Sequence, residues 1–219
     1  MATIDANFIW QMERVIDTYE RSYNEEYPVL SYDERPCQLL NDVVAPTLPS
    51  FGKIRREDYH YQRNGTCCIL MAIEPLTGKR IVEIRETRTK TDYKEFFEKI
   101  SKLYPKAKKI TIIQDNLNTH NPSSFYQNME AGDAFDLMNR FEMIYTPKKA
   151  SWLNVIEMEF AALSKQCLDR RIGDIKTLRS EVVTWTKKRA KDKVKIKWQF
   201  TKELARDKFK RLYNEEKNL

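Results

Sequence analysis

The spacing of apolar side chains changes along the chain and marks out its first elements. Over residues 7–23 they recur every three or four positions, which predicts an amphipathic helix. The segment VLSYD at 29–33 lies between two prolines and is typical of a short buried strand. Residues 41–56 are rich in proline and glycine and predict an irregular loop.

An antiparallel meander is expected next. The segment YHYQR at 59–63 is followed by Asn64-Gly65, the residue pair that favours a two-residue hairpin turn. The apolar run 66–74, a turn at 75–78 and the alternating segment 80–86 follow. We therefore expect three antiparallel strands.

The second half of the chain alternates between helical and strand patterns. Thr89 and Asp92 form a capping-box pattern ahead of an amphipathic helix that ends at Pro105. Residues 109–115 are apolar almost throughout, as in a strand covered on both faces. The remaining expected elements are a helix at about 131–141, a strand at 141–147, helices at about 152–169 and 174–190, and shorter structure to 213.

This order of elements predicts an α/β fold, a mixed sheet with helices on both faces. Asp33 and Asp115 would then close two strands, and in such sheets reactive groups gather at the carboxyl ends of the strands. If the two strands are neighbours, their carboxylates converge on a shared site that suits Mg²⁺, and a third acid would complete a two-metal site. The alternative is that each aspartate only caps a turn.

Composition narrows the class of protein. The 219 residues are 41% hydrophobic and 32% charged, which indicates one soluble globular domain with no membrane span. The N-terminus shows no secretory signal, so we expect a cytoplasmic protein. Four cysteines without a CxxC pair, and only two histidines, argue against structural zinc and favour buried free thiols.

Charge is unevenly distributed. The formal net charge is +7, and residues 165–219 hold 18 Lys and Arg against 8 Asp and Glu. Such a basic segment suits a polyanionic partner, of which nucleic acid is the commonest. The alternative is a solvated, lysine-rich helical face.

Three blocks of residues resemble a known family. They are LSYDERP around Asp33, IIQDNLNTH around Asp115, and YTPKKASWLNVIE, which ends at Glu157. Together they resemble the catalytic blocks of DDE-type insertion-sequence transposases of the mariner superfamily, and the resemblance runs over about residues 3–213. It implies a ribonuclease H-like fold in which Asp33, Asp115 and Glu157 are the catalytic, metal-binding carboxylates.

The resemblance also implies an activity, a cofactor and partners. Two Mg²⁺ ions, replaceable by Mn²⁺, would activate water to cleave double-stranded DNA at terminal inverted repeats, and the released 3′ hydroxyl would attack a TA-containing target. The enzyme would act as a homodimer at the nucleoid. We divide the chain into an N-terminal helix (1–26), a catalytic domain (27–170) and a basic helical tail of the same domain (171–219).

Other residues in these blocks have two interpretations each. Asn116 and His120 contact DNA or orient a metal-bound water, or else they only shape the turn after Asp115. Lys148 and Lys149 neutralise DNA phosphates, or else they are exposed turn residues. Helical periodicity permits either Glu157 or Glu159 as the third ligand, and the family pattern selects Glu157. Glu159 is then expected at a solvent-facing rim, paired with a lysine such as Lys165.

One departure from the family pattern affects function. Only about 28 residues precede the first catalytic strand, too few for the helix-turn-helix region that reads transposon ends in full-length relatives. We therefore expect the catalytic half alone: a reading frame joined to its partner by frameshifting, a cloned fragment or a decayed element. Two other functions stay open, namely a generic metal-dependent nuclease and a catalytically silent DNA-binding remnant.

Overall fold

A computed structural model describes residues 5–47, 51 and 58–215. Within these residues a single five-stranded sheet has the order β3-β2-β1-β4-β5. The strands are β1 (Val29–Asp42), β2 (Tyr61–Glu74), β3 (Lys79–Arg85), β4 (Ile110–Gln114) and β5 (Phe141–Tyr145). The helices are α1 (Ala6–Glu20), α2 (Lys90–Leu103), α3 (Ala131–Asn139), α4 (Ile156–Gln166), α5 (Ile175–Lys191), α6 (Lys202–Lys208) and α7 (Lys210–Glu215), with 3-10 turns η1 (Pro122–Tyr126) and η2 (Ser151–Leu153).

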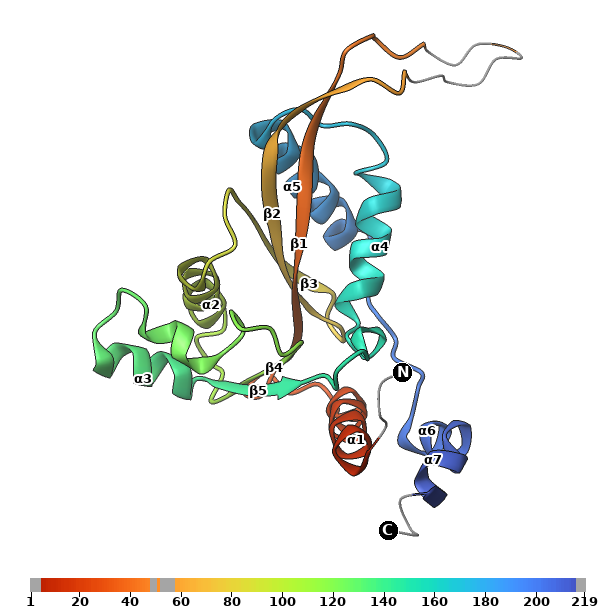
Figure 1. Ribbon diagram of the computed structural model, residues 1–219. Helices are drawn as coiled ribbons and strands as arrows, with labels where there is room; N and C mark the ends of the chain where they lie inside the picture. Colours follow the sequence, from red (N-terminus) through yellow and green to blue (C-terminus); the bar gives the residue numbers. More distant parts are fainter. Residues whose placement is uncertain (1–4, 48–50, 52–57, 216–219) are drawn as a thin grey trace.

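The sheet is mixed and covered on both faces (Figure 1). Strands β1, β2 and β3 pair antiparallel, whereas β1, β4 and β5 pair parallel. Helices α1, α4 and α5 pack against one face of the sheet, and α2 and α3 cover the other face. The predicted α/β sheet with helices on both faces is confirmed.

Two strongly patterned elements form as the sequence predicts. At the start of α2, the Thr89 side chain accepts from the Asp92 backbone N–H, and the Asp92 carboxylate accepts from the Thr89 backbone N–H. This reciprocal capping satisfies two backbone donors that would otherwise lack partners. All five residues of β4 are buried, because helices cover both faces of the sheet there.

Strand β1 is longer than predicted. It does not end at Asp33 but continues to Asp42, so Asp33 lies inside a strand rather than at its end. The continuation is possible because β2 supplies antiparallel partners for β1 from Ser31 to Asp42. Pro36 does not interrupt it, since β4 stops pairing with β1 after Ser31 and leaves that edge open.

The Asn64-Gly65 pair forms a bulge and not a hairpin turn. Strand β2 runs unbroken through it, and its register against β1 shifts from Gln38–Thr66 to Leu40–Arg63. Two residues of β2 therefore lie opposite one residue of β1, with Gly65 at a φ of 118°. Residues 61–63 of the predicted strand at 59–63 and the predicted run at 66–74 are parts of one strand, whereas residues 59 and 60 precede it. Part of the predicted loop at 41–56 lies outside the described residues.

Among the described helices, none combines the length and the apolar character that a membrane crossing needs.

Candidate active site

Asp33 and Asp115 occupy equivalent positions on neighbouring strands. In the parallel pairing of β1 with β4, Ser31 lies opposite Ile113. Each aspartate comes two residues after one member of that pair, Asp33 within β1 and Asp115 directly after β4. Side chains two residues apart on an extended strand point to the same face, so Asp33 is directed, like Ser31, away from the α2 side and to the face that α1, α4 and α5 cover. The tertiary fold thus brings together two acids that are far apart in sequence.

The half-buried Asp33 carboxyl group has a strongly shifted acidity. Burial raises its pKa to about 7, against the effect of the Glu34 backbone N–H, which donates to Oδ1 at 2.7 Å. The negative charges of Asp115 and Glu157 raise this pKa further, whereas the charge of His120 lowers it. Asp115 and Glu157 are therefore both close enough to Asp33 to act on it electrostatically.

Glu157 is exposed in the first turn of α4. The start of this helix is attached to β1 by Asn154, whose Nδ2 donates to the Tyr32 carbonyl at 2.9 Å. In addition, the Val155 N–H donates to the Tyr19 hydroxyl at 3.2 Å. Asn154 thus sets where Glu157 lies relative to Asp33. Sequence reasoning assigned no role to Asn154, although it lies in the recognised SWLN block.

The imidazole of His120 is fully buried beside Asp115. Its Nδ1 contacts the Asp115 carboxylate, and its Nε2 lies 3.3 Å from Oε1 of Glu34, which sequence reasoning also missed. Burial opposes a charge on this ring, but the two carboxylates outweigh that effect and raise the pKa of His120 to about 9. His120 therefore holds Asp115 from the side of the sheet that α2 covers, where its ring stacks on Tyr93.

Glu159 does not face solvent as predicted. It is only 1% exposed, and both of its oxygens are taken up by two arginines. Arg80 donates to Oε1 at 2.7 Å and to Oε2 at 3.1 Å, and Arg189 does so at 2.5 and 3.0 Å. The expected rim position and the pairing with Lys165 are wrong, because α4 turns this residue towards β3 and α5.

The remaining predicted residues are exposed at the surface. Asn116 directly follows Asp115 and is exposed. Lys148 and Lys149 are exposed in the turn after β5, where Lys149 has a φ of 63°. Their suggested contacts with DNA remain predictions.

The site has the chemistry of a divalent-cation site. Carboxylate oxygens are the donors that Mg²⁺ and Mn²⁺ prefer, and the negative charges of Asp115 and Glu157 both act on the buried Asp33 carboxyl group. In the part of the chain that the structure describes, no three His, Cys, Asp or Glu side chains are already grouped at metal-binding spacing. The carboxylates fit such ions by donor type and charge.

Comparison with known proteins decides the family. Residues 28–179 match the family model described as DDE superfamily endonuclease, and this range contains all three acids. The chain belongs to this family. Comparison with curated proteins returned no match.

Solved structures agree with this family in fold. The Mos1 transposase paired-end complex with left transposon end has a TM-score of 0.54 at 15% identity, with 81% of this chain and 55% of that chain covered. The Mos1 strand transfer complex gives 0.54 at 14% identity, with 82% and 54% covered. The Mos1 mariner paired-end complex with Mn gives 0.52 at 15% identity, with 82% and 55% covered. This likeness confirms the ribonuclease H-like fold. The chain spans about half the length of these solved proteins.

Proposed function

We propose that this chain is the catalytic region of a transposase that cleaves DNA at transposon ends and joins them to target DNA. The observation that carries the proposal is the equivalent placement of Asp33 and Asp115 along two neighbouring parallel strands, with Glu157 close enough to act on Asp33. The structures of similar fold are a Mos1 transposase paired-end complex and a Mos1 strand transfer complex, which supports the proposal.

Asp33, Asp115 and Glu157 would hold two Mg²⁺ ions, or Mn²⁺ in their place. Bound ions of this kind activate a water and stabilise charge on the phosphate under attack. The protein's own part is positioning: His120 holds the Asp115 carboxylate, and Asn154 holds the first turn of α4 against β1. A ligand set held in this way loses little freedom when the cation binds.

Double-stranded DNA is the proposed substrate, with terminal inverted repeats as the donor and a TA dinucleotide as the target. Lys148, Lys149 and Asn116 are exposed and would contact phosphates. The basic helices after residue 170 would add contacts that do not depend on base sequence. We further propose a homodimer that acts at the nucleoid in the cytoplasm, with a separate or frameshift-fused helix-turn-helix segment that reads the transposon ends.

A nicking and joining assay tests the proposal. Duplexes that carry the inverted repeats flanking the gene are incubated with the chain and Mg²⁺, Mn²⁺ or EDTA, and nicked and joined products are separated. We expect both products with either metal and neither in EDTA. Nicking of any duplex without joining would indicate a generic nuclease, and binding without nicking would indicate a catalytically silent remnant.

Variants connect the activity to the three acids. Asp33→Asn, Asp115→Asn and Glu157→Gln each remove one charge and keep the side-chain size, so we expect loss of nicking with the fold retained. Titration calorimetry with Mn²⁺ should show weakened binding in the two aspartate variants. Asp136→Asn, at an exposed position on α3, is the matched control and should bind Mn²⁺ as the wild type does. Equal Mn²⁺ affinity in all these proteins would contradict a shared metal site.

A further inference from the structure

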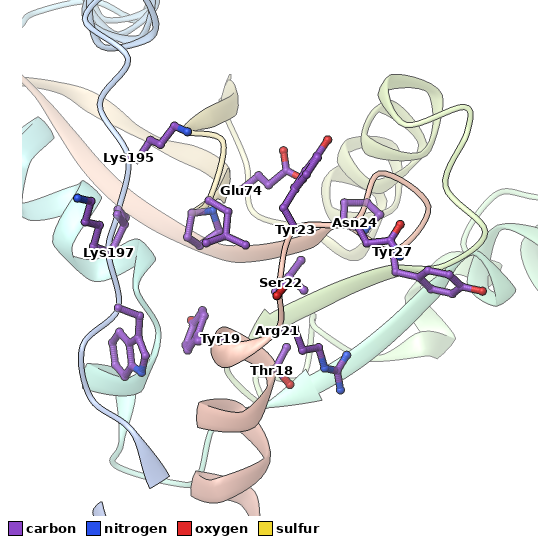
Figure 2. Close-up of a pocket in the computed structure, with 16 residues that line it drawn as sticks. Thr18, Tyr19, Arg21, Ser22, Tyr23, Asn24, Tyr27, Glu74, Lys195 and Lys197 are labelled. Atoms are coloured by element: carbon purple, nitrogen blue, oxygen red, sulfur yellow. The ribbon is translucent and has the colours of Figure 1, made fainter. Parts of the chain in front are cut away.

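A cavity of about 410 Å³ lies away from the three acids (Figure 2). It is lined by the end of α1, the turn that joins β2 to β3, and the extended segment 195–198 that follows α5. Its lining reaches Pro28 and Val29, at the N-terminal end of β1, whereas Asp33 and Asp115 lie beyond the other end of the β1–β4 pairing. A volume of this size is in the range of pockets that bind small ligands.

Aromatic rings form much of the cavity wall. Tyr19 and Trp198 face each other with ring centroids 4.9 Å apart, and Tyr23 and Tyr27 also line the cavity. Tyr23 is 55% exposed, so its ring has surface free for a ligand, whereas Figure 2 shows the ring of Tyr27 directed away from the other lining residues. Ring faces of this kind favour a planar, weakly polar guest that can stack on them.

A buried carboxylate adds one specific polar group to this apolar wall. Glu74 is 3% exposed; its Oε2 accepts from the hydroxyls of Thr77 and Tyr104, but its Oε1 accepts no hydrogen bond from any described residue. Figure 2 shows its side chain beside Tyr23, and the charge of Glu74 acts on that tyrosine. A buried acceptor without a donor is unfavourable. The guest that fits therefore brings an N–H group.

The rim of the cavity is basic. Lys195 and Lys197 are exposed on the segment that borders it, and Figure 2 shows both on that segment. Arg21 lies at the end of α1, 3.5 Å from Glu142. The Ile196 N–H donates to the Pro75 carbonyl at 3.1 Å, which fixes the segment next to the cavity. Cations at the rim disfavour an arginine or lysine side chain as the guest and favour a group linked to phosphate.

We propose that this cavity binds a nucleobase with an amino-bearing edge, guanine best of all, whose phosphate lies against Lys195 and Lys197. Guanine presents two neighbouring N–H donors to Glu74, whereas thymine presents one N–H between two carbonyl oxygens that the carboxylate repels. The base belongs either to an unpaired DNA strand or to a free nucleotide, and the experiment separates the two. Binding here needs no divalent metal and is independent of the proposed cleavage.

Fluorescence anisotropy in EDTA tests the site with the full chain. The probes are a single-stranded thymidine 9-mer and the same strand with one central guanine. We expect the guanine strand to bind about tenfold tighter, a difference of about 1.4 kcal/mol. Competition by dGMP but not dTMP would assign the site to a free nucleotide as well as to a strand. Displacement only by the guanine strand would assign it to unpaired DNA.

Two variants of residues that line the cavity, and a control variant of an equally exposed ring elsewhere, test whether guanine binds in this cavity. Tyr23→Ala removes a ring that is 55% exposed, and Glu74→Gln removes the carboxylate charge at nearly constant size. Both should reduce the guanine preference to less than about twofold. Phe135→Ala, at a 52% exposed ring on α3, should keep it, and circular dichroism checks that all three variants fold.

Two results would overturn the proposal. One is an equal affinity of the wild type for both strands, or a guanine preference that survives in both Tyr23→Ala and Glu74→Gln. The other is binding of a short arginine peptide that Tyr23→Ala abolishes, together with no guanine preference, which would assign the cavity to a protein partner.

Discussion

The side chain of Asn154 donates a hydrogen bond to the backbone carbonyl of Tyr32 at 2.9 Å. This contact joins the residue before Asp33 to the turn that begins α4, three residues before Glu157. Two of the three candidate ligands are thus placed relative to each other by one buried amide. We regard Asn154 as a positioning residue, because it acts through the backbone of its neighbours.

Asn154→Ala should weaken both stability and activity. Asn154 is 1% exposed, so its removal leaves the Tyr32 carbonyl buried without that donor, at a cost of about 1–3 kcal/mol in unfolding free energy. We expect a further loss of nicking by the folded protein, because the first turn of α4 is released. Urea denaturation and a nicking assay on the same preparation measure the two effects. Asn139→Ala, at an exposed position at the end of α3, is the control, and unchanged nicking in Asn154→Ala would contradict the positioning role.

Glu159→Gln should lower the stability of the protein and largely keep its nicking activity. Glu157→Gln should keep the stability and abolish the activity. Glu159→Gln leaves the 1% exposed Arg80 side chain without its counter-charge, and breaking such a buried pair costs about 3–5 kcal/mol. Nicking per folded molecule should stay within about tenfold of the wild type. Glu157→Gln alters an exposed residue, so it should keep the melting temperature and lose nicking. Equal melting temperatures for the two variants, measured by calorimetry, would argue against the ion pairs.

Gly65→Ala should destabilise the protein because of the backbone conformation at this position, not because of a steric clash. A Cβ at Gly65 would meet nothing within 4 Å, but the φ of 118° is one that alanine adopts at a cost of about 1–3 kcal/mol. Gly132→Ala is the matched control: it is equally uncrowded but lies in α3, where alanine should stabilise by about 0.4–1 kcal/mol. The midpoints of urea unfolding measure both effects, and the midpoint of Gly65→Ala should be lower than that of Gly132→Ala. The opposite ranking would contradict the bulge.

The buried thiols should react slowly. Burial raises the pKa of Cys67 to about 11 and that of Cys68 to about 12, so at pH 8 almost none of either thiol is in the reactive thiolate form. In a Cys37→Ser/Cys167→Ser variant we expect reaction with a disulfide reagent roughly a hundredfold slower than for an unperturbed thiol. The rate should rise with pH above 8 and increase sharply on unfolding in guanidinium. Prompt reaction of the folded variant would show that these thiols are accessible.

Several elements can be predicted from the sequence because they depend on residues that are close together along the chain. The α2 helix begins where Thr89 and Asp92 predict it, because capping involves residues three positions apart. The predicted helix over 7–23 forms as α1, and the continuous apolar run at 109–115 forms the fully buried β4. The family blocks point to the three acids for a related reason, since each block is a short segment with its own residue pattern.

Only the tertiary structure decides features that depend on a distant partner. The pattern around Asp33 predicts a strand that ends there, but β2 continues the pairing as far as Asp42. Asn64-Gly65 has the residues of a hairpin turn, yet β1 opposite it makes the same pair a bulge. Helical periodicity placed Glu157 and Glu159 at two edges of one stripe. Arg80 and Arg189, from elements remote in sequence, take Glu159 into the interior and leave Glu157 exposed, because a buried carboxylate is stable only where cations from other elements meet it.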